Sequence, residues 1–337
     1  MRMRLHELLH GPLLETRKTI LVVGAGGMLG HKVAQVLAAD DRFAVTCVTR
    51  RPVDARFAVS AARYVTGVDA LAGASVLAPL LAEHRPHVII NALGAVKQRD
   101  LASAVDGTYY LNGTVPHLLA LLNPNPEGRV IHFSTDCVFT GTRGNYRESD
   151  APDVVDLYGR SKACGELAYG RHLTIRTSMI GFEIATHLSL IAWLLQQPRG
   201  ATIRGFTNAI FSGLPTVTLA TTVQRLLVHH PTLAGLYHVA AEPIRKFDLL
   251  SRLNAAFDLG LQIDPDPSVT IDRSLDDSHF RTATGTTRPD WDTLVAELVV
   301  DARRTPYAAL YPQLAAWSDA TAASVTGSTA FDSRSHS

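Results

Sequence analysis

Short apolar runs alternate with longer amphipathic stretches along the chain up to about Gly181. The run TILVVGAGG at 19–27 is typical of a buried strand that ends in a glycine turn, and residues 28–40 follow it with helical spacing. The same alternation predicts strands within 43–50, 129–139 and 173–181, helices within 114–123 and 161–171, and a helix followed by a buried strand within 76–94. This order predicts an α/β protein with a doubly wound parallel sheet and helices on both faces.

Beyond about Gly181 the pattern becomes irregular and rich in proline, glycine and aspartate. We expect a smaller region there, built from insertions at the carboxyl ends of the later strands, where sheets of this type bind ligands. The chain then divides into an N-terminal extension (1–18), a main sheet domain (19–181), a smaller ligand-binding region that returns some chain to the main domain (182–317), and a tail expected to be disordered (318–337).

The composition excludes several classes of function. Of the 337 residues 46% are hydrophobic and 19% are charged, and the net charge is +1 without a basic stripe, so nucleic acid is not an expected partner. The cysteines are few and far apart, which predicts neither disulfides nor a metal site and fits a reducing cytoplasm. His6, Glu7 and His10 interrupt the N-terminus, so we expect no signal peptide, and no apolar run is long enough to span a membrane.

Gly24, Gly27 and Gly30 form a G-x-x-G-x-x-G pattern between the first strand and the first helix. Glycines at these positions allow a tight turn and the close approach of a pyrophosphate, whose charge meets the amide groups at the start of the helix. Glycines also serve ordinary turns, but the strand–turn–helix context favours a dinucleotide site. The sheet is therefore expected to be of the Rossmann type.

The end of the second strand bears on the choice of cofactor. Arg50 and Arg51 stand where an acidic residue would bind the ribose hydroxyl of NAD, and arginine pairs well with phosphate. NADP(H) is therefore the preferred cofactor and NAD(H) the alternative; both arginines could instead form a solvated turn. Asp69 is a candidate for binding the adenine amino group, or it is a turn residue.

Tyr158 and Lys162 lie four residues apart at the start of a predicted helix and thus on the same face of it. A lysine beside a phenol lowers the pKa of the phenol, so the tyrosine can exchange a proton with a carbonyl oxygen near neutral pH. Thr135, at the end of a strand, would give that oxygen a second hydrogen bond. Each residue alone has an ordinary structural explanation, but the combination downstream of a glycine loop indicates catalysis.

At these motifs the chain resembles an extended short-chain dehydrogenase/reductase, most closely the dTDP-4-dehydrorhamnose reductase group. The resemblance runs from about Thr19 to Ala316. It rests on GAGGMLG, INALGAV, LNGTVPHL, STDCVF, YGRSKACGE, IRTSMIG, GLYHVA and DDSHFRTATG. It implies NADPH-dependent reduction of the 4-keto group of a nucleoside-diphosphate-activated deoxysugar, with hydride from the nicotinamide and a proton from Tyr158.

The resemblance also assigns residues to the site. Thr135, Tyr158 and Lys162 match the catalytic triad, and Asn112 matches an asparagine that supports a proton-relay water in many members. Lys97 and Asn208 are candidate substrate contacts, or a loop charge and a turn residue, and Arg245 or Arg281 could hold the diphosphate. The remaining cofactor-binding residues are expected at Met28, Leu29, Asn91, Ala92, Leu93, Gly94, Ser134 and Met179, besides Tyr158 and Lys162.

Cys137 departs from the reductase pattern, which has tyrosine there. The related 4,6-dehydratases need glutamate at this position, so dehydration is not expected. In the GDP-fucose synthases a cysteine two residues after the catalytic hydroxyl works with a later histidine to epimerise the sugar. Cys137 and His187 could form such an acid/base pair, or be a packed thiol and an exposed ring.

A remote alternative is a non-catalytic, cofactor-binding regulatory subunit. Such relatives usually lose the tyrosine or the lysine, whereas both are present in this chain. The expected partner is thus a nucleotide-sugar substrate. A homodimer is a further expectation from the resemblance.

Overall fold

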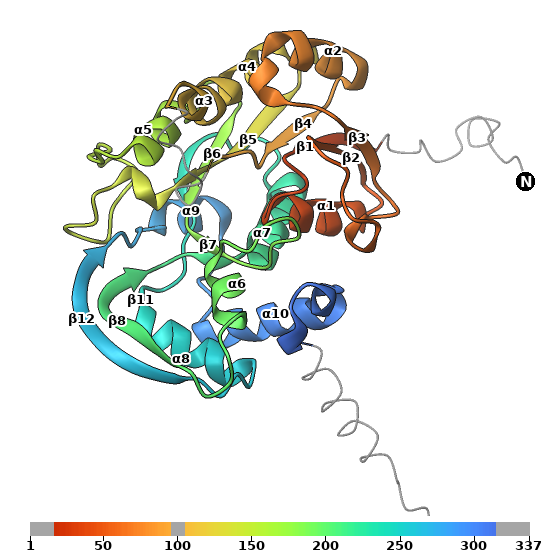
Figure 1. The fold of residues 1–337 in the computed structure, drawn as a ribbon. Helices are drawn as coiled ribbons and strands as arrows, with labels where there is room; N and C mark the ends of the chain where they lie inside the picture. The colour runs from red at the N-terminus through yellow and green to blue at the C-terminus, as the bar shows by residue number, and fades with distance from the viewer. Residues whose placement is uncertain (1–16, 96–104, 315–337) are drawn as a thin grey trace, which may run out of the picture.

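The computed structural model describes residues 17–95 and 105–314, which build a seven-stranded parallel sheet with helices on both faces (Figure 1). Its strands run in the order β10-β6-β5-β4-β1-β2-β3, and all neighbours are parallel. The bounds are β1 Lys18–Val23, β2 Phe43–Thr49, β3 Arg63–Thr66, β4 Val88–Asn91, β5 Arg129–Thr135, β6 Leu173–Thr177 and β10 Gly235–His238. The predicted Rossmann-type α/β fold is confirmed.

The central strands have no exposed face. Every residue of β4, β5 and β6 is buried, as expected of parallel strands covered on both sides by helices. On one face lie α1 (Gly30–Ala38) and α7 (Thr216–His229). On the other lie α2 (Ala74–His84) and α4 (Val115–Leu122). The chain then reaches α5 (Leu157–Cys164) through α3 (Val105–Tyr109), a π-helical turn η3 (Tyr110–Thr114), α4 and β5.

The C-terminal part adds a small sheet in the order β11-β8-β12 and a two-stranded pair of β7 and β9. Their bounds are β7 Met179–Ile180, β8 Thr202–Phe211, β9 Leu214–Pro215, β11 Ile244–Arg245 and β12 Gln262–Asp272. The helices of the C-terminal part are α6 Leu190–Leu195, α8 Lys246–Ala256, α9 Ser278–Thr284 and α10 Trp291–Arg304.

The short 3-10 turns of the described chain are η1 Ala55–Phe57, η2 Ala70–Ala72, η4 Asp136–Val138 and η5 Tyr307–Ala309.

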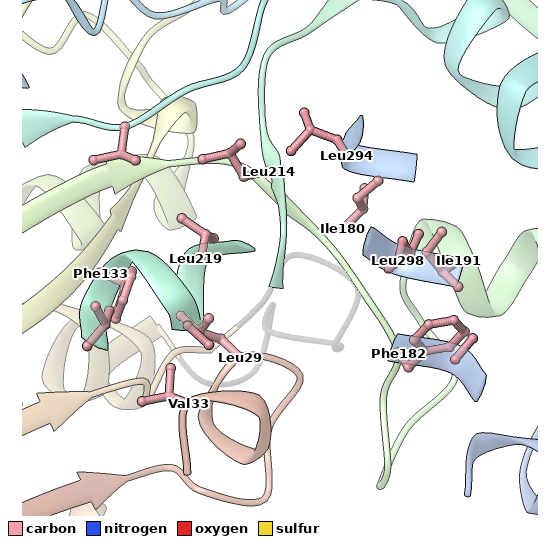
Figure 2. Packing of buried hydrophobic residues seen from close by; sticks show 14 of the residues in the cluster. Leu29, Val33, Phe133, Ile180, Phe182, Ile191, Leu214, Leu219, Leu294 and Leu298 are labelled. Atoms are coloured by element: carbon pink, nitrogen blue, oxygen red, sulfur yellow. The ribbon is translucent and has the colours of Figure 1, made fainter. Parts of the chain in front are cut away.

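One large apolar core joins the two parts. Figure 2 shows Val33 of α1 and Leu219 of α7 in the same cluster as Ile180, and as Leu294 and Leu298 of α10. Buried area of this kind is the main stabilising contribution, so the C-terminal part is anchored to the face of the sheet that carries α1 and α7.

Within the described ranges, no helix is long and apolar enough to cross a membrane. The same residues contain no cluster of three or more histidine, cysteine or carboxylate side chains that could hold a metal ion. The predicted N-terminal extension, apart from its last residues 17 and 18, and the predicted tail at 318–337 lie outside the described residues.

Candidate active site

The glycine turn between β1 and α1 is closed by contacts that tolerate no side chain at its end. A Cβ on Gly30 would lie 2.1 Å from the carbonyl oxygen of Gly24, so the start of α1 can approach the end of β1 only with glycine there. Leu29, the N-cap of α1, provides no side-chain hydrogen bond to the helix start. The amide groups at this helix end are therefore suited to an anion such as the predicted pyrophosphate.

The turn after β2 that carries Arg50 and Arg51, called the arginine turn below, lies beside this loop. A Cβ on Gly26 would be 3.9 Å from the side chains of both Thr49 and Val53, which flank Arg50 and Arg51 in the chain. Both arginines are exposed. The end of β2 thus carries cationic side chains next to the predicted pyrophosphate loop, where a ribose phosphate would need them.

Asp69 forms a turn in the structure. Its carboxylate accepts a hydrogen bond of 3.1 Å from the backbone N–H of Leu71 and caps the short turn η2. This is the turn role that the sequence left open. The arrangement gives no separate support to the adenine contact, which stays a prediction.

Asn91 holds the segment that follows β4. The side chain is fully buried; its Oδ1 accepts from the N–H of Leu93 at 3.2 Å, and its Nδ2 lies 3.0 Å from Nδ1 of His132. The amide therefore fixes the turn that carries Ala92 and Gly94. If Asn91 contributes to cofactor binding, it does so by fixing this turn, because its own side chain faces the interior.

Asn112 ties the same segment to the helix of the predicted tyrosine and lysine. Its Oδ1 accepts from the N–H of Ala95 at 2.8 Å, and its Nδ2 donates to the hydroxyl of Ser161 at 3.0 Å. It stands in the π-helical turn η3, a form that is frequent at functional sites. The fully buried amide acts here as a clamp, and Lys97, the predicted substrate contact beyond it, lies outside the described residues.

Helix α5 brings the predicted catalytic side chains to the end of β5. The side chain of Asp156 caps the helix by accepting from the N–H of Gly159 at 2.8 Å. A Cβ on Gly159 would lie 2.1 Å from the carbonyl oxygen of Cys137, so α5 is pressed against the chain directly after Thr135. This close approach places Tyr158 beside Thr135.

Lys162 is buried and its ammonium donates to the carbonyl oxygen of Phe133 at 2.5 Å. Burial lowers the pKa of Lys162 to about 8, and the nearby carboxylate of Glu166 opposes this change. The strand therefore holds Lys162 on one side of the end of β5, while Thr135 and Tyr158 meet at its tip. The structure thus pairs Tyr158 with Thr135 and bonds Lys162 to the same strand, two residues before Thr135.

The pKa of the Tyr158 phenol corrects one expectation. Burial raises it above its ordinary range, Cys137 raises it further, and the hydrogen bond with Thr135 offsets only part of the increase. The phenol pKa is not lowered by Lys162 as the sequence suggested, because the ammonium is directed at the carbonyl of Phe133. Tyr158 is thus protonated at neutral pH and suited to donate its proton.

Ser134 lies next to Thr135 in β5. Its hydroxyl donates to Oε1 of Glu166 at 2.7 Å, so the side chain supports a buried carboxylate, and its part in cofactor binding stays a prediction. Glu166 also forms a two-point ion pair with Arg176, with both N···O distances 2.7 Å. Glu166 was missed in the sequence, although its position four residues after Lys162 is the spacing that pairs side chains near a helix.

Cys137 lies beside Thr135 and Tyr158, two of the predicted catalytic residues. Its backbone N–H donates to the hydroxyl of Thr135 at 3.1 Å, and its Sγ is 3.7 Å from a guanidinium nitrogen of Arg273. Arg273 follows β12, so the C-terminal part contributes a cation to the catalytic end of β5. Burial raises the pKa of the neighbouring Asp136, and the charge of Arg273 opposes the increase. No sequence signal pointed to Arg273.

His187 has its described ring contact with Tyr311 and not with Cys137. Its side chain is exposed and its ring meets Tyr311 edge-on, with the ring centroids 5.3 Å apart. Cys137 therefore lies beside Tyr158, whereas the described contact of His187 is with Tyr311. The acid/base pair of Cys137 and His187 stays a prediction. Met179, in β7, is half-buried and packs against the main apolar core.

The predicted substrate contacts are not drawn into one site. Asn208 is exposed on β8 and donates to a backbone carbonyl of β12 at 3.4 Å. Arg245 pairs with Asp248 at 2.8 Å, and Arg281 pairs with Asp277 at 2.9 Å. Arg281 also lines a cavity of about 270 Å³ between α7, α9 and α10, whose lining includes none of Thr135, Tyr158 and Lys162. These substrate roles stay predictions.

A family model described as the RmlD substrate binding domain matches residues 18–256. The match begins with β1 and includes the glycine turn, the end of β5 and α5. The chain belongs to the RmlD substrate binding domain family. Within this RmlD-family chain, residues 257–314, which contain β12 and α10, lie beyond the match but pack on the same core.

Individual relatives of this RmlD-family chain differ in their names. dTDP-4-dehydrorhamnose reductase from Aggregatibacter actinomycetemcomitans is 25% identical over 234 residues, which are 66% of this chain and 74% of that protein. Methionine adenosyltransferase 2 subunit beta from Pongo abelii is 29% identical over 151 residues, 45% of this chain and 42% of that one. A crystal structure of dTDP-4-dehydrorhamnose reductase from Bacillus anthracis in complex with NADP has the same fold, with a TM-score of 0.70, 19% identity and coverage of 84% and 99%.

Proposed function

We propose that this protein is an NADPH-dependent reductase that converts the 4-keto group of a nucleoside-diphosphate-activated deoxysugar into a hydroxyl group. The observation that carries the proposal is the pairing of Tyr158 with Thr135 at the end of β5, with Lys162 bonded to the same strand, in the sheet that presents the glycine turn. The names of the dTDP-4-dehydrorhamnose reductases to which the chain is similar support the same chemistry.

Each residue has a defined task in this reaction. The glycine turn together with Arg50 and Arg51 would hold NADPH, which would supply the hydride for the carbonyl carbon. Thr135 and Tyr158 hold the carbonyl oxygen, and the protonated phenol of Tyr158 gives its proton to the alkoxide that hydride transfer forms. Lys162 donates to the carbonyl of Phe133 and so holds the end of β5, which positions Thr135 for this step.

The test is NADPH oxidation with a panel of dTDP-, UDP- and GDP-linked 4-keto-6-deoxysugars. We expect turnover with at least one of them, and a loss of about 10²- to 10⁴-fold in kcat for Tyr158→Phe, the range of general acid catalysis. Tyr169→Phe, at an exposed phenol that meets His117, is the matched control and should retain activity. Wild-type rates in Tyr158→Phe would contradict the proposal.

A bifunctional epimerase and reductase is the second candidate. It is favoured by the position of Cys137 beside Thr135 and Arg273, where a thiol could reach a carbon next to the ketone. Wild-type enzyme in D₂O would then place deuterium in the sugar ring, and Cys137→Ser would not, while still reducing an already epimerised ketone. His187→Asn tests the second group of the pair. A product without ring deuterium rules out the epimerase.

The similarity to methionine adenosyltransferase 2 subunit beta supports a third candidate, a cofactor-binding subunit of another enzyme. Tyr158 and Lys162 together favour the reductase, because a subunit without catalysis needs neither. Tight NADPH binding without turnover of any sugar in the panel, together with co-purification of a partner enzyme, would favour the subunit.

A further inference from the structure

Tyr307 connects the C-terminal end of the described chain with the glycine turn. It stands in η5, beyond the part of the chain that matches the family model, and its side chain is fully buried. Its hydroxyl lies 2.6 Å from Nε2 of His31 in α1. Residues far apart in sequence thus meet directly behind the predicted pyrophosphate loop.

The ring of His31 connects Tyr307 with the glycine turn through its two nitrogens. Its Nδ1 lies 2.8 Å from the carbonyl oxygen of Gly27, which also accepts from the backbone N–H of His31 at 3.1 Å. Burial lowers the pKa of His31 to about 3, so the ring is neutral. Because a carbonyl oxygen only accepts, Nδ1 carries the proton, and Nε2 accepts from the Tyr307 hydroxyl.

The ring of Tyr307 reaches a second part of the cofactor site. It stacks on Phe57 at a centroid distance of 5.9 Å and on Phe182 at 4.3 Å, with interplanar angles of 26° and 22°. Phe57 ends the segment that begins with the arginine turn. Lys32, 5.2 Å from the Tyr307 ring centroid, forms a buried ion pair with Asp301 of α10 and fixes this end of α10 to α1.

We propose that Tyr307 is a positioning residue for the dinucleotide, which sets the glycine turn through His31 and the arginine turn through Phe57. The proposal rests on the proposed function only for its cofactor, NADPH. Without the Tyr307 hydroxyl the Nε2 atom of His31 loses its donor. This nitrogen is then a buried acceptor without a partner, and the ring that holds the Gly27 carbonyl is no longer fixed from its other side, which loosens the glycine turn.

The test is NADPH affinity, measured by fluorescence titration of the purified full chain. We expect Tyr307→Phe, which keeps the stacked ring, to bind NADPH about 10-fold more weakly, the ratio that corresponds to about 1.4 kcal/mol. His31→Leu should lose at least as much, whereas His31→Asn, whose amide can still donate to Gly27, should bind within about 3-fold of wild type. In the His31→Leu background Tyr307→Phe should add no further loss.

Tyr311→Phe is the matched control. The hydroxyl of Tyr311 is also buried and donates to the carbonyl of Glu183 at 3.0 Å, and its ring meets Phe182, but these contacts do not involve the glycine turn. It should lower the melting temperature without changing NADPH affinity. In any turnover assay Tyr307→Phe should raise KM for NADPH and leave kcat unchanged.

Equal NADPH affinity for wild type and Tyr307→Phe, or equal losses in Tyr307→Phe and Tyr311→Phe, would overturn the positioning role while leaving the proposed function intact. A wild-type protein that binds neither NADPH nor NADH would overturn both. Binding without turnover leaves the positioning role standing and contradicts only the reductase.

Discussion

Replacing Lys162 by methionine should stabilise the fold while it removes the proposed activity. Lys162 is 5% exposed, and burial lowers its pKa from the usual 10.5 to about 8. Since one pKa unit is about 1.4 kcal/mol, the ammonium destabilises the folded state by about 3 kcal/mol at neutral pH. Loss of its hydrogen bond to Phe133, which has a charged donor, offsets about 1.5–3 kcal/mol of this and leaves a gain of up to about 1.5 kcal/mol for the variant.

The pH dependence separates this explanation from simple repacking. Below pH 8 the lysine is charged in both states and the full cost is present. Between about 8 and 10.5 the unfolded chain still binds the proton and the folded chain does not, so wild-type stability rises with pH in this window. The advantage of Lys162→Met should therefore shrink from pH 8 upward.

Urea unfolding of wild type, Lys162→Met and the control Lys18→Met, at an exposed position of β1, measures both quantities. The control should match wild type at each pH. A Lys162→Met variant that is less stable than wild type at pH 7, with a difference independent of pH, would refute the assignment of Lys162 as a strained buried cation.

Two further substitutions test the surroundings of the predicted catalytic residues. Glu166→Gln leaves Arg176, whose side chain is 3% exposed, as an uncompensated buried charge and should cost about 3–5 kcal/mol in urea unfolding. The control Glu127→Gln, in an exposed pair with Arg171, should cost under about 1 kcal/mol. Similar losses in both variants would contradict the buried pair. Gly159→Ala puts a Cβ 2.1 Å from the carbonyl oxygen of Cys137 and must move α5. We therefore expect about 1–3 kcal/mol of destabilisation and a drop in kcat of about 10²-fold. A variant with unchanged kcat would show that α5 does not set the position of Tyr158.

Local patterns predicted the parts of the site that short stretches of chain build. The glycine turn is read from a strand, a turn and a helix in succession, and Tyr158 and Lys162 share a helix face because they are four residues apart. The alternation of side chains along a strand also explains the contact of Ser134 with Glu166. Side chains alternate along a strand, so Ser134 and its neighbour Thr135 point to opposite faces of β5.

Other features depend on tertiary contacts that no local pattern contains. Arg273 reaches Cys137, and Tyr307 reaches His31, only because the C-terminal part folds back on the sheet. The strand β12 was also unpredictable, because the sequence QIDPDPSVTID contains prolines that argue against a strand. It forms at the edge of the small sheet, where a missing N–H can face away from the neighbouring strand.

The most direct test of the reductase is transfer of label from NADPH that carries deuterium at the reactive nicotinamide carbon. With its dTDP-linked 4-keto-6-deoxysugar, or a UDP- or GDP-linked one, the wild-type protein should place deuterium on the newly formed carbinol carbon of the sugar, as read by mass spectrometry and NMR. Tyr158→Phe should lose nearly all transfer while still binding the cofactor. A wild-type protein that binds NADPH and transfers no deuterium to any of these sugars would contradict the proposed reduction.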